Sequence, residues 1–332
     1  MPKRSTYFAR KALIFAAEVF VAITLNFVIA RLMPGNPVNA LIARYIGKGR
    51  YNPALVNAIK DLYGLSNQPL YVQYWHYLVN TFHGNLGISF TYFPTPVGQL
   101  IAQALPYDIV LLGLSTILSF AIGSLLGIVL ALRRGGVADT LITNVFNFLG
   151  NFPYFFVAIL LLYLLGFTFK LFPTGGIYSP TVEPGLTLRF VSSYLDHLFL
   201  PALTIVLTSV GGWILLTRNV GITNLFEDYA ALGEIAGISR WRYALYYIGK
   251  NSILPSFTSF GISLGFIVSG AVVTEEIFDY PGTGYLLVQA VGNYDYPLMQ
   301  GIFLVIVLAV LVANFIMDIV YGFIDPRVGA YE

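Results

Sequence analysis

The fold class follows from residues 106–132, which read PYDIVLLGLSTILSFAIGSLLGIVLAL. Asp108 is the only charged residue in this stretch. A helix needs about 20 consecutive apolar residues to cross the hydrocarbon core of a bilayer, which is roughly 30 Å thick. Irregular backbone cannot leave its amides unpaired in lipid, so a stretch of this kind crosses as a helix. We therefore predict a membrane-spanning helix over residues 106–132.

Five further stretches have the same apolar character. Together they predict an all-α integral membrane protein with six transmembrane helices, over residues 12–33, 106–132, 141–169, 198–217, 253–274 and 299–324. The first follows a short basic segment, as the apolar part of a signal peptide does. It is longer than the roughly 7–15 apolar residues of a signal peptide, so we expect it to be retained as a span.

The composition agrees with lipid as the main solvent. Apolar residues make up 57% of the 332 residues, while charged residues make up only 10%, against roughly 25% in a soluble domain. The net charge of +2 and the lack of a basic run give no sign of nucleic-acid binding. There is no cysteine, and the three histidines are interpreted as structural residues, so we expect no metal site in this chain.

The positions of lysine and arginine predict the orientation. Cytoplasmic segments of membrane proteins are enriched in these residues. If the N-terminus is cytoplasmic, 11 of the 18 fall on that side: Lys3, Arg4, Arg10, Lys11, Arg133, Arg134, Arg218, Arg240, Arg242, Lys250 and Arg327. The chain is thus predicted to be a multi-pass protein of the cell membrane with both termini, residues 1–11 and 325–332, in the cytoplasm.

The same orientation assigns the segments between the spans. Residues 34–105, 170–197 and 275–298 are predicted to lie outside, and residues 218–252 form the only long cytoplasmic loop. The first exterior region is rich in Tyr, Asn and Gly, and we expect short helices in it near residues 53–63 and 70–82.

Motifs for catalysis or nucleotide binding are missing. Gly47-Lys48 and Gly249-Lys250 lack the upstream glycine of a phosphate-binding loop, and the sequence has no nucleophile elbow or zinc-binding histidine pair. We therefore expect a chain that is not an enzyme, has no catalytic residues and holds no cofactor itself.

A few polar residues in or beside the spans are candidates for a substrate path. Carboxylates inside a membrane are costly and usually functional, although each can also pair with a neighbouring helix. The candidates are Glu18, Trp213, Glu275, Glu276 and Asp318.

The cytoplasmic loop carries the pattern of a short amphipathic helix over residues 225–237. Leu225, Tyr229, Leu232 and Ala236 recur at helical spacing, and acidic residues lie off this stripe. Gly237 is placed to end the helix, and Ser239 to cap the next one. Such a helix can rest on lipid or on a protein. Its acidic residues favour a protein, because helices that bind an anionic membrane surface are normally basic.

The chain resembles the inner-membrane permeases of ABC importers, in particular the B-type subunit of the dipeptide/oligopeptide family. RLMPGNP at residues 31–37 and GNLGISF at residues 84–90 are similar to two motifs of that family, with Asn36 and Asn85 in place of its usual aspartates. Further similar motifs follow in the family's order, at residues 130–135, 172–176, 197–204, 275–284, 295–297 and 325–327.

The resemblance implies a type I ABC importer permease fold with an exterior region between helices 1 and 2. It implies a second, C-type permease subunit, two ATP-binding subunits that hold ATP and Mg, and an extracytoplasmic solute-binding protein as partners. The loop at 218–252 corresponds to the family's coupling motif, although residues 230–235 lack the basic residues common there. The residues expected to couple to the ATPase are Leu225, Asp228, Tyr229, Leu232, Ala236 and Gly237.

The cargo implied by the resemblance is a short peptide, and an oligosaccharide is the alternative. We expect the exterior segments to receive the binding protein through Tyr280, Tyr285 and Tyr294, although these segments could instead only cap the helix bundle. The rival interpretation is a proton-coupled secondary transporter that uses Glu18 and Asp318. The inverted repeats of such transporters are not evident in the sequence.

Overall fold

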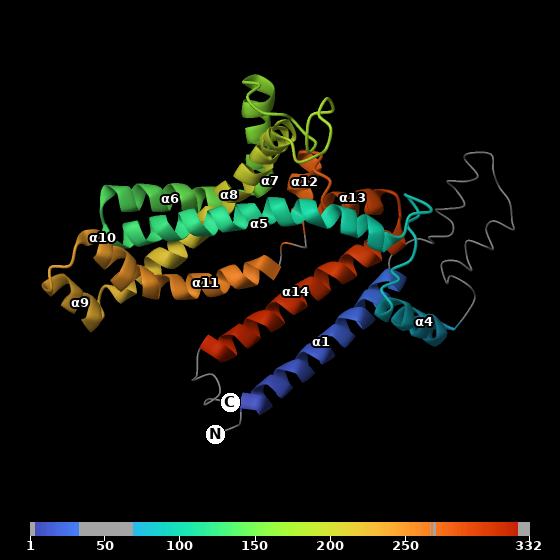
Figure 1. Cartoon of the computed structure of the whole chain (residues 1–332), viewed down its shortest axis with the longest axis horizontal. Coiled ribbons are helices and arrows are strands. Elements are labelled where there is room, and N and C mark those ends of the chain that lie inside the picture. Colours follow the sequence, from blue (N-terminus) through green and yellow to red (C-terminus); the bar gives the residue numbers. More distant parts are fainter. Residues whose placement is uncertain (1–3, 33–68, 266, 268–269, 325–332) are drawn as a thin grey trace. The chain divides into compact units, whose positions relative to one another are not determined.

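The computed structural model describes residues 4–32, 69–265, 267 and 270–324, which form helices and connecting segments (Figure 1). No strand occurs among them, and the only β-type pairing is an isolated bridge between Ile88 and Pro96. The elements are α1 (Arg4–Leu32), α4 (Leu70–Phe82), α5 (Val97–Leu132), α6 (Val137–Asn151), α7 (Tyr154–Leu161), the π-helix η1 (Leu162–Thr168), α8 (Leu188–Asn224), α9 (Asp228–Ile235), α10 (Arg240–Arg242), the π-helix η2 (Tyr243–Gly249), α11 (Lys250–Gly265), α12 (Val272–Ile277), α13 (Thr283–Gly292) and α14 (Tyr296–Ile324).

The chain divides into two compact units, one made of residues 1–106 and 282–332 and the other of residues 107–281. In the first unit α1 packs along α14, where Phe15 stacks on Phe315 with ring centroids 4.5 Å apart. The core of this unit lies between the start of α5, α13 and the start of α14. It is formed by Val97, Leu100, Ile101, Ala290, Leu298, Met299 and Ile302.

A buried carboxylate joins two segments of the first unit. Asp295 accepts hydrogen bonds from the Ser89 hydroxyl and from the backbone N–H groups of Thr91, at 2.8 Å, and Leu298, at 3.2 Å. The last of these caps the first turn of α14. Asp295 therefore ties the segment between α4 and α5 to the start of α14.

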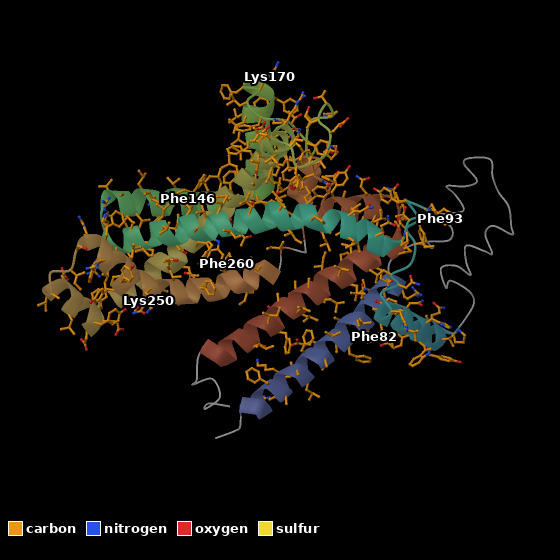
Figure 2. The ribbon with its side chains drawn as sticks, viewed as in Figure 1. Phe82, Phe93, Phe146, Lys170, Lys250 and Phe260 are labelled. Carbon is orange, nitrogen blue, oxygen red and sulfur yellow. The ribbon has the colours of Figure 1, made fainter. Side chains whose placement is uncertain are left out.

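In the second unit α8 packs closely against its neighbours because glycines lie at the contacts. A Cβ atom on Gly127 of α5 would lie 2.8 Å from the carbonyl oxygen of Ile214, and one on Gly211 of α8 would lie 2.5 Å from that of Phe146, which Figure 2 labels on α6. Small residues of this kind let helix backbones approach each other in membranes. Side-chain hydrogen bonds add to the packing, at 2.8 Å between Ser119 and Ser209 and at 2.8 Å between Thr217 and Ser256.

Among the described residues, four helices are long and apolar enough to cross a membrane: Phe8–Leu32, Val97–Leu132, Leu188–Asn224 and Tyr296–Ile316. They confirm helices at four of the six predicted positions, although α5 and α8 begin earlier than predicted. Of the two short helices expected in the first exterior region, α4 confirms the one near residues 70–82. The one near residues 53–63 lies outside the described residues.

The prediction of one helix over residues 141–169 was wrong in detail. The chain forms α6 and then α7 with η1, and the two parts are bent by 98° at Phe152 and Pro153. Proline has no N–H to donate and disfavours helical geometry in the residue before it. Phe152 accordingly has extended backbone angles, with φ −75° and ψ 135°. If the bent pair counts as one crossing, the described part of the chain has up to five candidate spans.

The predicted helix over residues 253–274 is also not continuous. α11 ends at Gly265, and α12 starts only at Val272. Gly270 has a φ of +68°, which is the left-handed region that an α-helix of L-residues avoids. Among the described residues, residues 253–274 therefore do not add an uninterrupted span to the four named above.

Candidate functional site

The loop after α8 forms a short helix that starts later than predicted. Leu225 ends α8, since its N–H bonds to the carbonyl oxygen of Gly221 at 3.1 Å, and Glu227 precedes α9 with extended backbone angles. A single helix from residue 225 to 237 is therefore wrong, because a turn at Phe226 and Glu227 separates Leu225 from α9. The remaining predicted coupling residues lie on α9 or just beyond its end.

The two sides of α9 have different surroundings. Ala230 and Gly233 are buried, and a Cβ atom on Gly233 would lie 2.9 Å from the ring of Tyr247 in η2. On the outer side, Leu232 is 66% exposed and Ile235 is 84% exposed. Asp228 is also exposed. The small residues thus let α9 pack closely on η2, and its outer side presents large apolar side chains next to acidic ones.

The predicted stripe is accordingly split. Leu225 and Tyr229 are half-buried, whereas Leu232 and Ala236 are exposed. The hydroxyl of Tyr229 is buried without a hydrogen-bond partner among the described residues. Sequence reasoning missed Ile235, which shares the exposed side with Leu232 three residues earlier.

The predicted end of this helix is confirmed. Gly237 has a φ of +65°, and its N–H bonds to the carbonyl oxygen of Glu234 at 3.1 Å. No atom lies within 4 Å of the position that a Cβ on Gly237 would occupy, so the backbone angle and not the space favours glycine there. Ser239 precedes α10 as expected, but its side chain makes no capping hydrogen bond.

Tyr243 of η2 lies near α9, and its surroundings disfavour the ionised form of its hydroxyl. Burial raises the pKa of the Tyr243 hydroxyl above its ordinary value, and the nearby Glu234 carboxylate raises it further.

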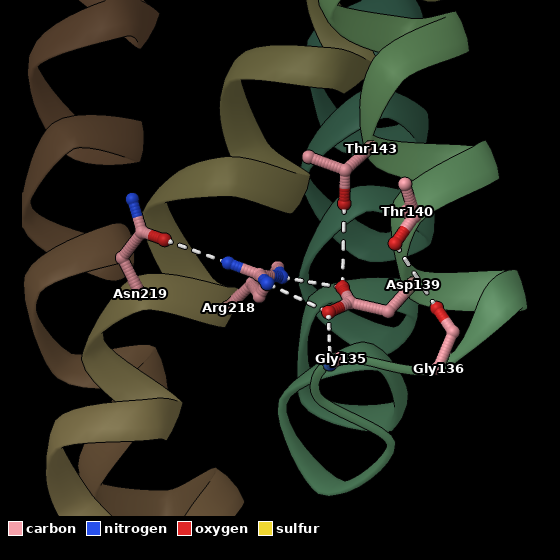
Figure 3. Close-up of polar contacts among 7 residues, drawn as sticks. All are labelled: Gly135, Gly136, Asp139, Thr140, Thr143, Arg218 and Asn219. Atoms are coloured by element: carbon pink, nitrogen blue, oxygen red, sulfur yellow. Dashed lines mark hydrogen bonds and ion pairs between the residues drawn. The ribbon is translucent and has the colours of Figure 1, made fainter.

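A buried ion pair fixes the base of α8 to the start of α6 (Figure 3). The Asp139 carboxylate accepts from Nε of Arg218 at 2.5 Å and from Nη2 of Arg218 at 2.7 Å. It also accepts from the backbone N–H of Gly135 at 2.9 Å and from the Thr143 hydroxyl at 3.4 Å. A bidentate pair of this kind is strong and directional. From the sequence, Arg218 was only one of the basic residues that predict the orientation, and no local pattern indicates its pairing with Asp139.

Two further contacts connect the α9 region to the long helices. The guanidinium of Arg134 lies 4.5 Å from the ring centre of Phe226, directly before α9. On the other side, Nδ2 of Asn224 donates to the Ser252 hydroxyl of α11 at 3.0 Å. Together with the ion pair, these contacts hold the segment directly before α9 and the end of α8 to α6, α11 and the turn after α5, whereas α9 itself packs on η2.

The structure does not bring the predicted path residues of each unit into one cluster. In the first unit Glu18 is exposed on α1, and Asp318 pairs with Lys11 at 3.1 Å. In the second unit Glu275 is buried and accepts from the Ala271 N–H at 2.5 Å at the start of α12, while Glu276 is exposed.

Trp213 belongs to an aromatic cluster of the second unit. Its ring centre lies 5.5 Å from that of Phe120 in α5 and 6.5 Å from that of Phe260, which Figure 2 labels on α11. Phe120 and Phe260 are themselves stacked at 4.5 Å. The cluster therefore joins three helices through partly exposed aromatic rings.

The three predicted docking tyrosines differ in accessibility. Tyr280 is fully buried, lies 3.0 Å from the Tyr194 hydroxyl and donates to the Tyr107 carbonyl oxygen at 3.3 Å. Burial raises its pKa. Tyr280 is thus a core residue and not a docking residue. Tyr285 is half-buried, and Tyr294 is exposed.

The chain has similarity to known transport proteins over nearly its whole length. Residues 123–330 match the family described as binding-protein-dependent transport system inner membrane component. The oligopeptide transport system permease protein AppB of Bacillus subtilis (strain 168) is 31% identical over 326 residues, which cover 98% of this chain and 99% of that protein.

Two other relatives show a similar level of identity. The probable D,D-dipeptide transport system permease protein DdpB of Escherichia coli (strain K12) is 31% identical over 320 residues, or 92% of each chain. The nickel import system permease protein NikB of Staphylococcus aureus (strain bovine RF122 / ET3-1) is 31% identical over 309 residues, or 93% of this chain and 87% of that protein. The region matched by the family includes α9 and the π-helix η2 on which it packs.

Proposed function

The chain belongs to the family of binding-protein-dependent transport system inner membrane components, and from this premise we propose that it is a permease subunit of an ATP-driven importer of short peptides. The proposed cargo is supported by relatives named as oligopeptide and dipeptide permeases, which align with almost the whole chain. The mechanism rests mainly on the surroundings of α9. This helix exposes the apolar side chains of Leu232 and Ile235 and packs on η2 through Gly233.

For the membrane topology we propose six crossings. The bent pair of α6 with α7 and η1 forms the third crossing, and α11 with α12 forms the fifth. Both termini lie in the cytoplasm, and residues 34–105 lie outside. The lysine and arginine distribution supports this orientation.

The topology is testable because the chain has no cysteine of its own. Single cysteines replacing Ser179 or Asn293 should react with a membrane-impermeant maleimide in intact cells. Cysteines replacing Gly136 or Thr223 should react only after permeabilisation. An exchange between the two groups would break the six-crossing arrangement.

The proposed mechanism is alternating access driven from α9. An ATPase subunit binds the exposed side of α9, and closure of two ATPases displaces α9 together with the base of α8. The permease then changes between two conformations that differ in their affinity for cargo, and this difference couples ATP to transport. The proposal is supported by the close packing of α9 on η2, which continues into α11. The Asp139–Arg218 pair and the Asn224–Ser252 hydrogen bond join α8 to α6 and to α11 and would carry the motion onward.

The remaining partners are a C-type permease subunit and a solute-binding protein outside. We propose Tyr285 and Tyr294 as docking residues for the binding protein. Of the predicted path residues, Trp213 is the best candidate, because its partly exposed aromatic cluster can contact apolar side chains of a peptide.

The proposal is tested by reconstituting the complete complex in lipid vesicles. We expect uptake of short peptides that requires ATP, both ATPases and the binding protein, and no ATP hydrolysis by the isolated chain. Oligosaccharides and a nickel chelate serve as competing cargoes. Uptake driven by a proton gradient without the ATPases would overturn the proposal in favour of a secondary transporter.

A further inference from the structure

Helix α4 lies against the last turns of α1. The hydroxyls of Tyr74 and Thr24 are 2.7 Å apart, and Nδ2 of Asn26 donates to the Tyr77 hydroxyl at 3.1 Å. In Figure 1, α4 lies across the C-terminal end of α1 and does not run along it. Because α1 is a candidate membrane span that ends at Leu32, α4 is held at the level where this span leaves the hydrocarbon.

The residues of α4 form three stripes around the helix. One stripe contacts α1 through Tyr74 and Tyr77. A second is apolar and exposed: Tyr71 is 76%, Trp75 65% and Phe82 71% accessible, and Val79 lies between them. The third is exposed and polar and consists of His76, Asn80 and His83, the last of which follows the helix directly. At 3.6 residues per turn, the stripes are separated from one another by roughly 120°.

This division suits a helix that meets protein, lipid and water on three sides. α4 contains no Asp, Glu, Lys or Arg, and Trp and Tyr are enriched where a membrane meets water. A protein-binding surface is also rich in aromatic residues, but it normally has a polar rim around them and is often accompanied by Arg. The absence of charge and the aromatic stripe therefore favour the interfacial region of the bilayer as the occupant.

Arg31 indicates which side of α4 faces water. Its Nε and Nη2 atoms donate to Oε1 of Gln73 at 3.2 Å and 3.0 Å. An arginine near the end of a span extends its charged group toward water. Gln73 is adjacent to the polar stripe around the helix, roughly 60° from His76 at 3.6 residues per turn. The polar stripe and the guanidinium thus share one side.

Exposed apolar residues also lie on the last turns of α1, which is a candidate membrane span. Leu25, Val28, Ile29 and Leu32 of α1 are large apolar residues that are exposed in the same unit. We infer that α4 is an interfacial anchor, with Tyr71, Trp75, Val79 and Phe82 in the lipid and with His76, Asn80 and His83 in water. This inference concerns the membrane surface and depends neither on the cargo nor on the ATPase.

The inference predicts opposite environments for adjacent residues of one helix. Trp75→Cys and His76→Cys are each made in the full-length chain, labelled with a nitroxide and placed in lipid nanodiscs. Collision of the label with oxygen, which concentrates in lipid, is compared with collision with a water-soluble nickel chelate. We expect the ratio of oxygen to nickel collisions to be several-fold higher at position 75 than at position 76.

Phe82→Cys and Asn80→Cys repeat the comparison one to two turns later, so the test survives if one variant fails to insert. Equal ratios on the two stripes would overturn the inference. Low collision with both reagents at positions 75 and 82 would also overturn it, because a protein would then cover the stripe. If that protection arises only when the solute-binding protein is added, the stripe is a docking surface for that protein.

Discussion

Helices α9 and α4 both expose large apolar side chains, yet they differ in charge and in how they are held. α9 carries Asp228 and Glu234 beside its exposed Leu232, and it is packed on η2 through small residues. α4 has no charged residue and is held to α1 by hydrogen bonds between side chains. The comparison teaches that exposed apolar area alone does not identify a partner. In the two proposals above, the charge beside the apolar residues assigns a protein partner to α9 and a lipid partner to α4.

The largest expected effect comes from placing a charge on the exposed side of α9. Leu232→Asp would bury an unpaired carboxylate in the contact with an ATPase, at a cost on the order of several kcal/mol. We expect loss of ATPase pull-down and of peptide uptake. Trp75→Asp on α4 is the matched control and should retain the ATPase if it inserts. Normal assembly and uptake by Leu232→Asp would contradict the assignment of α9.

A somewhat smaller effect is expected at the ion pair that supports α9. Asp139→Asn leaves Arg218, whose side chain is 20% exposed, without its carboxylate. The expected cost lies between the roughly 1 kcal/mol of an exposed pair and the roughly 3 kcal/mol of a buried one. The variant should unfold at a lower temperature and show reduced uptake for each ATP hydrolysed. The measurements are thermal unfolding in detergent and the ratio of uptake to hydrolysis in vesicles. If both stay at the wild-type level, the pair does not support coupling.

Gly237→Val tests the end of α9. A β-branched residue in the left-handed region costs about 1–2 kcal/mol, and no neighbouring atom would add a clash. We expect the variant to insert and assemble but to hydrolyse ATP with little uptake, since α9 would be displaced. Gly84→Val is a control, because Gly84 also has positive φ and open space but lies in the other unit. Equal uptake defects in the two variants would argue against a specific role for Gly237.

The smallest effect is expected where α4 meets α1. Tyr74→Phe removes one hydrogen bond to Thr24, and such bonds between membrane helices are worth about 0.6 kcal/mol. Thermal unfolding should change only slightly, and uptake should remain. A large loss of stability in Tyr74→Phe would mean that this one hydrogen bond holds α4 as firmly as close packing holds α9. The proposed contrast between the two helices would then fail.

The sequence predicted those parts of the fold that depend on local composition. The helices at residues 106–132 and 299–324 could be predicted because their apolar runs are long enough to span the hydrocarbon core of a bilayer. The break at Phe152 was missed because apolar residues continue on both sides of Pro153. Hydropathy alone therefore joined two helices that the proline separates.

The candidate site was predictable only in part for a similar reason. Gly237 was identified because a glycine after a helical pattern is a local signal. The Asp139–Arg218 pair joins positions far apart in the sequence, and the choice of partner depends on how α6 and α8 pack. The buried face of α9 was missed because Ala230 and Gly233 are small, and only the structure shows that the rings of Tyr243 and Tyr247 fill the space beside Gly233.

Asp295 restricts which amino-acid substitutions this protein can accept in evolution. Two of its three donors are backbone N–H groups, at Thr91 and Leu298. These two hydrogen bonds survive any side-chain change except to proline, although Leu298 is also held by its place in the apolar core. Asp295 itself has no such freedom. Asparagine would present an NH₂ group where two acceptor oxygens are needed, and glutamate would place its oxygens one methylene too far. Inherited substitutions should therefore accumulate around this carboxylate much sooner than at it.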